Sequence, residues 1–268
     1  MDAEAEGYKM NIKVLKKDKN KLIFLIEKIN PATANAVRRF AMNYVPTLAI
    51  DEVSFQKNSS ALYDEIITHR LALIPIKTDL KSYNLPSECK CKGKGCQNCQ
   101  LILTIKAKGP CVVYSSELKS EDPKAIPIID KLPIVKLLKD QEIKAECTAV
   151  LGQGKDHMKF SPCHIWYRGY PELKITKDSD IKKALSKIHS GIIIQKGQGL
   201  EIKDITKWNE AVEEILENNS IEITSSQENF IFYLESWGQL EPKEILTKAI
   251  DIFDDKLDEF EKLVKKIK

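Results

Sequence analysis

Residues 242–268 read PKEILTKAIDIFDDKLDEFEKLVKKIK, and they carry the clearest pattern in the sequence. The opening proline suits the first turn of a helix, and the large apolar residues that follow recur at spacings of 4, 3, 4, 3, 4 and 3. This spacing predicts a long helix with a narrow apolar seam. Because a large side chain left in water forgoes about 1.5–3 kcal/mol, the seam packs on the chain's own core or on a partner subunit, and its narrowness favours the partner. The seam consists of Leu246, Ile250, Phe253, Leu257, Phe260, Val264 and Ile267.

The N-terminal part of the chain alternates between apolar and polar residues. Two alternating stretches within residues 8–28 flank the polar residues 17–20, which predicts a β-hairpin with one wet face. Asn30 and Pro31 then suit the N-cap and the first position of an amphipathic helix. A strand is expected at 48–55.

The middle of the chain is read from shorter patterns. Residues 61–77 predict a short helix that runs into an apolar segment. Strands are expected at 101–107, 111–115 and 143–151. Residues 117–135 contain three prolines, and they predict a loop.

Residues 164–225 have a different rhythm, in which strand and helix patterns alternate. Their order of strand, helix, strand, strand, helix and strand suggests a small ferredoxin-like module. The strands are expected near 171–176 and 220–225, the helices at 178–189 and 206–218, and a hairpin across 191–203 that turns at 196–199.

The composition is that of a globular protein. The chain has 268 residues, 43% of them hydrophobic and 30% charged, and its net charge of +3 is too small to indicate nucleic-acid binding by itself. The longest uncharged stretch, residues 40–50, is far shorter than the roughly 20 apolar residues of a membrane-spanning helix. The acidic N-terminus lacks the apolar segment of a secretory signal, so a cytoplasmic protein is expected.

Four of the seven cysteines lie within residues 89–99. Such a cluster in a chain expected to be intracellular indicates a metal site more than a disulfide framework. Four thiolates can enclose one zinc ion tetrahedrally, and Gly93 and Gly95 let the loop curl around it. An iron–sulfur cluster, disulfides or free thiols are the alternatives that this spacing leaves open. The predicted zinc ligands are Cys89, Cys91, Cys96 and Cys99.

No motif of an independent enzyme is found in the sequence. Phosphate-binding, dinucleotide-binding and nucleophile-elbow patterns are missing. The stretch Gly152–Gln153–Gly154–Lys155 fits a turn better than a phosphate loop. We therefore expect no catalytic residue in this chain.

Four stretches resemble a known family. NPATANAVRRFAMNYVPTLAIDEVSF (30–55), LYDEIITHRLALIPI (62–76), LGQGKDHMKFSPC (151–163) and FIFYLESWGQLEPKEILTKAIDIFDDKL (230–257) occur in the order in which the family has them. The family contains the larger α-like subunit of archaeal DNA-directed RNA polymerase, the third-largest subunit of eukaryotic polymerase II and the N-terminal domain of the bacterial α subunit. The resemblance implies a non-catalytic assembly subunit of the polymerase, which acts as an enzyme only within the complex.

The resemblance also implies an α+β fold with a split organisation. Its parts are an α-like dimerisation domain (residues 1–49 and 223–268), an inserted mainly-β assembly domain (50–163) that carries the cysteine loop 89–99, and a nested ferredoxin-like domain (164–222).

The family's partners come with the same resemblance. The long helix is expected to pair with a smaller α-like subunit, L, and the heterodimer to hold the small subunits N and P. By resemblance, Arg38, Arg39, His69 and Arg70 lie towards the second-largest subunit. Neither sequence-specific DNA binding nor a membrane partner is expected.

One departure from the family concerns its iron–sulfur cluster. Many members carry cluster cysteines in the third domain, whereas this chain has no cysteine after Cys163. We therefore expect no iron–sulfur cluster. The rival hypothesis is a stand-alone zinc-loop protein that binds nucleic acid through the lysines of the cysteine loop, which lacks the aromatic residues that would stack on bases.

Overall fold

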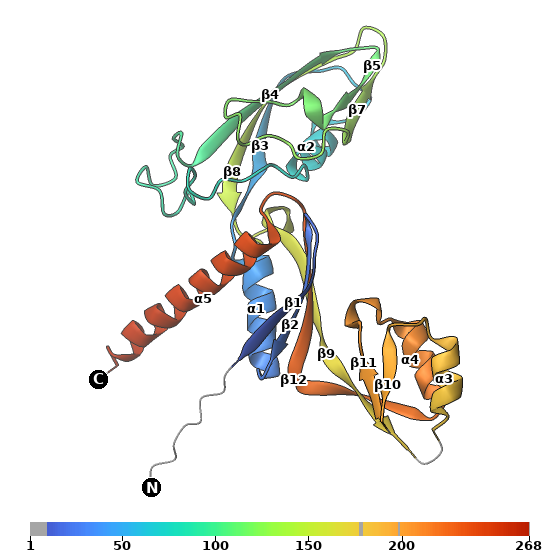
Figure 1. Cartoon of the computed structure of the whole chain (residues 1–268). Coiled ribbons are helices and arrows are strands. Elements are labelled where there is room, and N and C mark those ends of the chain that lie inside the picture. Colours follow the sequence, from blue (N-terminus) through green and yellow to red (C-terminus); the bar gives the residue numbers. More distant parts are fainter. Residues whose placement is uncertain (1–9, 177–178, 198, 268) are drawn as a thin grey trace. The chain divides into compact units, whose positions relative to one another are not determined.

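The computed structural model describes residues 10–176, 179–197 and 199–267 (Figure 1). The expected hairpin start at 8–9, the expected helix start at Asp178 and Gln198 of the expected turn lie outside these residues. The chain divides into two compact units. One comprises the described residues up to Ala36 and those between Trp166 and Leu234, and the other comprises Val37–Ile165 and the described residues from Glu235 onward.

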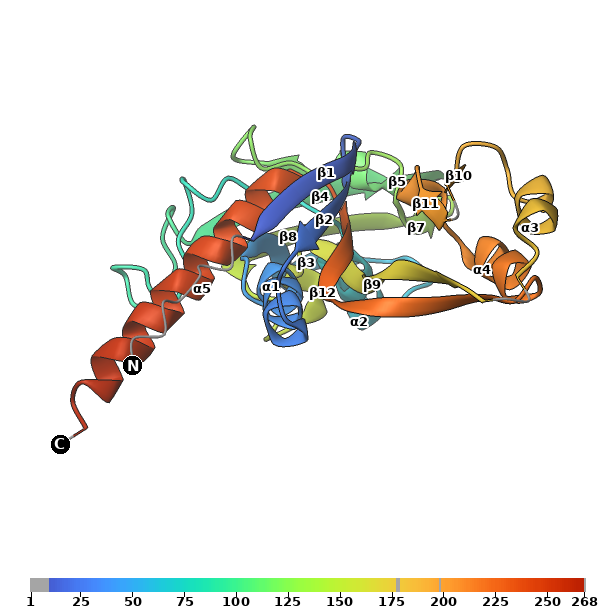
Figure 2. The same ribbon diagram turned by 60° about the horizontal axis from the view of Figure 1, so that its bottom comes forward.

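The first unit is built on a four-stranded sheet with the strand order β1-β2-β12-β9. β9 and β12 run side by side in both views (Figure 1, Figure 2). The predicted N-terminal hairpin is confirmed, because β1 and β2 pair from Asn11↔Glu27 to Lys17↔Leu22. The strands are β1 (Asn11–Lys17), β2 (Lys21–Glu27), β9 (Cys163–Ile175) and β12 (Ile221–Ser236).

The expected burial of the hairpin's apolar face holds for β2 but not for β1. Phe24 is buried and stacks on Phe232 with ring centroids 5.0 Å apart. Ile12 and Val14 lie opposite Ile26 and Phe24 across the ladder, and both are more than half exposed. The edge strand therefore has apolar side chains that the described residues leave exposed.

The predicted order of strand, helix, strand, strand, helix and strand is present between β9 and β12. The pairing differs from that of one continuous ferredoxin-like sheet, because β9 and β12 belong to the four-stranded sheet whereas β10 and β11 pair with each other. A core that includes Trp208, Leu216 and Ile231 joins these elements. They are α3 (Ile181–Lys187), β10 (Ile193–Lys196), β11 (Gly199–Ile202), the 3-10 turn η3 (Ile205–Lys207) and α4 (Glu210–Glu217).

One carboxylate ties α4 to the sheet. Glu213 of α4 accepts hydrogen bonds from the guanidinium of Arg168 on β9 and from the indole N–H of Trp208. Partial burial raises the pKa of Glu213, but the hydrogen bonds and the charge of Arg168 outweigh it and hold that pKa below its usual value.

The second unit holds the mainly-β part of the chain. Its sheet has the order β3-β8-β4-β6, and β5 and β7 form a separate pair. Every second residue of β8 is buried, which is the alternation of a strand with one face on the core. The strands are β3 (Thr47–Asn58), β4 (Gln100–Lys108), β5 (Cys111–Tyr114), β6 (Lys119–Ser120), β7 (Pro133–Leu137) and β8 (Glu142–Gly152), with helix α2 (Asp64–Ala72) and the 3-10 turns η1 (Ser115–Glu117) and η2 (Met158–Phe160).

The loop predicted at 117–135 is wrong at both ends. Lys119–Ser120 pair with β4 as β6, and β7 begins at Pro133 and pairs with β5. Proline is tolerated there because it occupies the first position of an outer strand. The three prolines of this stretch led to the prediction of a loop, so these two short strands were not predicted.

Helices α1 (Pro31–Asn43) and α5 (Pro242–Val264) begin where the sequence predicted. The side-chain oxygen of Asn30 accepts a hydrogen bond from the Thr33 amide at 2.8 Å, as an N-cap does. Within the second unit, Phe253 of α5 packs on Phe40 of α1 with ring centroids 4.7 Å apart. No helix among the described residues is long and apolar enough to span a membrane.

The stretch Gly152–Lys155 forms the predicted turn, and it caps the C-terminal end of α1. The amide of Lys155 donates to the Asn43 carbonyl at 2.9 Å, and the side-chain amide of Gln153 donates to the Tyr44 carbonyl at 2.8 Å. A Cβ atom at Gly154 would lie 2.2 Å from the carbonyl oxygen of Met42. Glycine is required there because two backbones meet without room for a side chain.

Gly154→Ala is expected to lower the free energy of unfolding by about 1–3 kcal/mol, because the added methyl group forces the turn away from α1. Urea unfolding followed by tryptophan fluorescence measures this. The control is Gly199→Ala, where the nearest atom to the added Cβ lies 3.6 Å away. Equal stability of Gly154→Ala and wild type would show that the close approach is not required.

Glu213→Gln is expected to destabilise the protein by about 1–2 kcal/mol at pH 7, because a charged acceptor of two hydrogen bonds is lost. A carboxylate with a lowered pKa contributes stability that is complete above the unfolded-state value of about 4.5 and is lost as the pH falls through the folded-state value. The difference between variant and wild type therefore shrinks as the pH falls from about 4.5 through the lower folded-state pKa. Urea unfolding at several pH values tests this, with the exposed Glu214→Gln as control; a difference that is the same at every pH contradicts it.

Candidate functional site

The cysteine loop lies between α2 and β4 and is shaped by tight turns. The carbonyl of Cys89 accepts a hydrogen bond from the Lys92 amide at 2.8 Å, and the carbonyl of Cys96 accepts from the amides of Cys99 and Gln100, each at 2.9 Å. The predicted role of the glycines is confirmed, because Gly93 and Gly95 have φ angles of 77° and 87°. These turns bring four side chains to one point.

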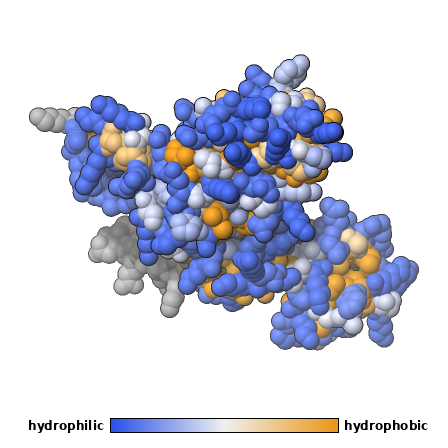
Figure 3. Space-filling view, turned by 90° about the horizontal axis from the view of Figure 1, so that it is seen from above, coloured by the Kyte–Doolittle hydropathy of each residue, from blue (hydrophilic) through white to orange (hydrophobic). Residues whose placement is uncertain are grey.

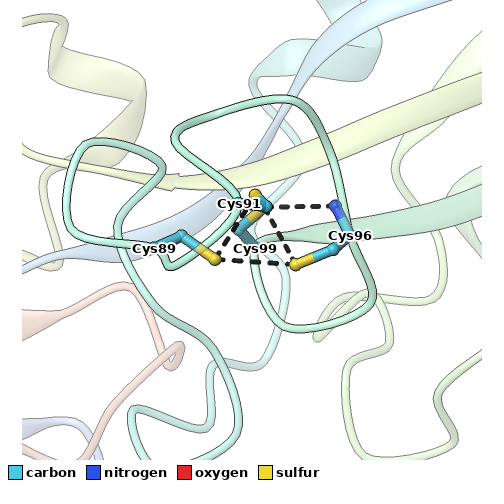
Figure 4. Close-up of side chains that lie close together, drawn as sticks. All are labelled: Cys89, Cys91, Cys96 and Cys99. Carbon is cyan, nitrogen blue, oxygen red and sulfur yellow. Dashed lines mark hydrogen bonds between the residues drawn. The ribbon is translucent and has the colours of Figure 1, made fainter.

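All four predicted ligands converge, and their sulfur atoms face one another (Figure 4). The Sγ atoms of Cys89 and Cys91, of Cys89 and Cys96, and of Cys91 and Cys99 are 3.5 Å apart, and those of Cys96 and Cys99 are 3.7 Å apart. A tetrahedral ion with metal–sulfur bonds of about 2.3 Å places its ligands about 3.8 Å apart. The cluster therefore matches a tetrathiolate site in size.

The four cysteines are free thiols in this structure. Their sulfurs are too far apart for the bond of about 2.05 Å that a disulfide requires. Burial raises the pKa of Cys99 to about 12, whereas hydrogen bonds with Cys89 and Cys99 lower the pKa of Cys91 to about 6. Since a cation binds thiolates, it would favour the deprotonated form of every member. The lysines at 90, 92 and 94 are exposed around the loop, where they offset that negative charge.

The predicted seam of α5 is largely exposed in this chain. The helix buries a different stripe against the rest of its unit, formed by Pro242, Ile245 and Ala249. The seam side chains are half-buried at Leu246 and Phe253, and exposed at Ile250, Leu257, Phe260, Val264 and Ile267, with Phe260 at 65% and Ile267 at 78%. The helix thus has one apolar stripe that holds it in place and another that none of the described residues covers.

The predicted docking residues are placed on two helices. Arg38 and Arg39 lie on α1, where Arg39 is exposed and Arg38 is half-buried. His69 is exposed on α2, and its neighbour Arg70 donates a hydrogen bond to the Ile134 carbonyl at 2.7 Å. Arg70 therefore braces α2 against β7 in its own chain.

Sequence reasoning missed an apolar cavity of the second unit, at the C-terminal end of α2. Its exposed side chains include Leu73, Met158 and Trp237, which come from segments far apart in the sequence. Figure 3 shows that one face of the molecule is mainly polar, with smaller apolar patches on it. Periodicity could not predict this cavity, because no single element contains it.

A four-thiol loop with the dimensions of a metal site and an exposed apolar seam on a helix are features expected of a subunit that binds other chains in a larger assembly. Comparison with known proteins agrees. Residues 50–162 match the RNA polymerase Rpb3/RpoA insert domain family. The chain is 34% identical over 260 residues to DNA-directed RNA polymerase subunit Rpo3 of Archaeoglobus fulgidus, a match that covers 96% of this chain and 98% of the relative.

Subunits with the same name from other organisms match over a similar length. The identity is 35% over 255 residues with Pyrococcus horikoshii Rpo3, covering 94% of this chain and 96% of the relative. It is 34% over 261 residues with Methanosphaera stadtmanae Rpo3, covering 93% and 96%. The chain belongs to the Rpo3 family of DNA-directed RNA polymerase subunits, and the α+β fold inferred from the sequence is confirmed.

Proposed function

We propose that this chain is a non-catalytic assembly subunit of a DNA-directed RNA polymerase, the counterpart of the larger α-like subunit of the archaeal enzyme. The observation that carries the proposal is the uncovered seam of α5 in a chain of the Rpo3 family. The work of such a subunit is binding: it presents apolar and polar surfaces on which other subunits assemble. A cytoplasmic location follows from this role.

The partner of the seam is a smaller α-like subunit, L, that supplies a second helix. Leu257, Phe260 and Val264 are spaced to face such a helix, and burying them recovers about 1.5–3 kcal/mol each. The small subunits N and P bind the resulting heterodimer. Arg39 and His69, both exposed, face the second-largest subunit together with Arg38, whereas Arg70 acts through the position of α2.

The domain division inferred from the sequence belongs to the same proposal. Residues 1–49 and 223–268 form the dimerisation domain, 50–163 the inserted domain and 164–222 the ferredoxin-like domain. The match of the insert-domain family to residues 50–162 supports the bounds proposed for the inserted domain.

The cysteine cluster holds a structural zinc ion. Its size fits a tetrathiolate, and all four positions around the ion are filled by protein, so the ion braces the loop. The loop is otherwise polar and contributes few buried side chains. No iron–sulfur cluster is proposed for the third domain, and a brown chromophore in protein purified without air would contradict this.

The rival function, nucleic-acid binding through the cysteine loop, rests on the exposed lysines at 90, 92 and 94. Family membership favours the polymerase. The test of the proposed function is purification of the tagged chain from its own cells, with the co-purifying proteins identified by mass. Two large and several small polymerase subunits in fixed proportion support it, and a lone chain or one bound only to nucleic acid overturns it.

Phe260→Asp is expected to weaken pairing with the small partner at least about 100-fold, because a charge enters a dry helix seam at a cost of about 3 kcal/mol or more. Titration of the purified partner into the chain measures this. Phe260 suits the test better than Phe253, which also packs on Phe40. The control is Lys262→Asp, on the opposite face of α5. Unchanged pairing of Phe260→Asp would refute the shared seam.

Cys96→Ser is expected to reduce bound zinc from about one ion per chain to near zero, because three thiolates no longer close a tetrahedron. Elemental analysis of protein purified without chelator measures the metal, and limited proteolysis shows whether the loop between α2 and β4 opens. Cys111→Ser, at an exposed cysteine outside the cluster, is the control. Wild-type protein that contains no zinc would contradict the proposal.

A further inference from the structure

The second unit contains a surface cavity of about 430 Å³ whose lining is nearly all apolar. Four segments build it: the end of α2, the loop before β7, the region of η2, and the turn between β12 and α5. Each segment contributes one large apolar side chain that is 46–59% exposed: Leu73, Ile129, Met158 and Trp237. A cavity of this size and lining has the dimensions of a site for a small molecule.

The charged and hydroxyl groups of the lining are occupied by the chain itself. The ammonium group of Lys159 donates to Asp51 at 2.6 Å and to the Ile50 carbonyl at 3.2 Å. The hydroxyl of Ser161 donates to the Cys163 carbonyl at 3.0 Å. Because a charged ligand would lose its water here without gaining a counter-charge, the cavity favours an uncharged molecule.

One polar atom of the lining residues lacks a partner, the side-chain oxygen of Gln239. The residue is 4% exposed, and its side-chain amide donates to the Leu48 carbonyl at 3.4 Å. Since that carbonyl accepts only from the NH₂ group, the Oε1 atom is left over, and it is buried without a donor among the described residues. A ligand that brings an N–H group to this acceptor satisfies it.

The apolar side chains around the cavity favour an aromatic ligand. The Trp237 side chain is 49% exposed and Met158 is 59% exposed, and both belong to the lining. Aromatic rings stack on indole or meet it edge to face, and a thioether sulfur makes favourable contacts with a ring edge. A flat ring therefore matches these two side chains better than a flexible aliphatic chain does.

Hydrogen bonds within the chain connect the walls of the cavity. The Ile128 amide donates to the Pro75 carbonyl at 3.0 Å, and the Trp237 amide donates to the Pro162 carbonyl at 3.2 Å. The Thr78 amide donates to the Gln239 carbonyl at 3.1 Å, which links the segment after α2 to the turn before α5. A ligand thus meets walls that are already linked, which lowers the entropy lost on binding.

We propose that this cavity is a binding site for a small, uncharged aromatic molecule that carries a ring N–H group, of which indole is the simplest example. The ring lies against Trp237 and Met158, and its N–H donates to the Oε1 atom of Gln239. The site uses contacts within this chain alone, so it goes beyond the proposed function and does not depend on it.

NMR spectra of the full chain with isotope-labelled tryptophan test the proposal, because the chain has only three tryptophans. Indole is added stepwise, and the Trp237 side-chain signal, assigned with Trp237→Phe, is expected to shift until it saturates. Trp166 is the internal control for stacking of indole on any exposed ring, since it is 44% exposed and lies in the first unit. Its signal, and that of the buried Trp208, are expected to stay in place.

A matched pair of ligands tests the hydrogen bond. N-methylindole has the same ring without the N–H, and we expect it to bind about three- to tenfold more weakly than indole, the factor that one hydrogen bond contributes. Gln239→Met removes the acceptor and keeps an unbranched side chain. In this variant the two ligands are expected to bind equally well.

Leu73→Lys places a charge at the cavity, while lysine remains favourable at the C-terminal end of a helix. It is expected to weaken indole binding at least about tenfold. The control is Leu138→Lys, the same substitution at a leucine of the same unit that is 56% exposed and lies outside the cavity.

Three results overturn the proposal: no saturable shift of the Trp237 signal, equal shifts of Trp166 and Trp237, or equal affinity of the wild type for indole and N-methylindole. If Gln239→Met does not fold, the ligand pair on the wild type and the Leu73→Lys comparison still decide. Each of these results leaves the polymerase assignment standing, because co-purification tests that assignment separately.

Discussion

The contact between Phe40 and Phe253 fixes the rotation of α5 about its own axis, and the surfaces of the second unit depend on it. Together with the burial of Ile245 and Ala249, this contact decides which side of α5 faces the chain. The remaining apolar positions then point outward along the seam. Phe40 also stacks on Tyr44 at 4.6 Å, and the Lys155 and Lys256 ammonium groups lie 5.6 and 5.7 Å from the Tyr44 ring. The aromatic rings of Phe40, Tyr44 and Phe253 thus connect α1 to α5. The two lysines extend this cluster to the turn after β8, because cations are attracted to the faces of aromatic rings.

The cysteine loop is a segment that hydrophobic packing alone does not hold. Between α2 and β4 the chain runs through a mainly polar stretch in which few side chains are buried, so hydrophobic packing cannot hold it. Four sulfurs at tetrahedral separation meet at a single point there, where a bound metal ion would replace that packing with metal–sulfur bonds. The segment between β9 and β12 has no such cysteine cluster among its described residues. There, the carboxylate of Glu213 and a hydrophobic core around Trp208 connect α4 to the sheet. Local bracing in this protein is therefore matched to how much apolar surface each segment carries.

Local patterns in the sequence were enough to place α1, α5, the N-terminal hairpin and the four converging cysteines, because spacing along one segment determines each of them. The same reasoning failed where distant segments decide the outcome. The prolines of residues 117–135 led to the prediction of a loop, so β6 and β7 were missed. These two strands form because they pair with β4 and β5. The separate pairing of β10 and β11 also follows from tertiary contacts, since the order of elements is the same in either arrangement. The sequence did not predict which stripe of α5 faces inward. It did not predict the cavity at the end of α2 either, because contacts between distant segments decide both.

The two uncovered surfaces of the second unit differ in how they are held, and this difference sets what binding does at each. The seam lies on a single helix, and none of the side chains in the outer half of that helix is buried by the described residues. The segments that line the cavity are connected in pairs by backbone hydrogen bonds, from the Ile128 amide to the Pro75 carbonyl and from the Trp237 amide to the Pro162 carbonyl. Binding at the seam would therefore stabilise the outer half of α5, whereas the segments around the cavity are already held in place without a partner.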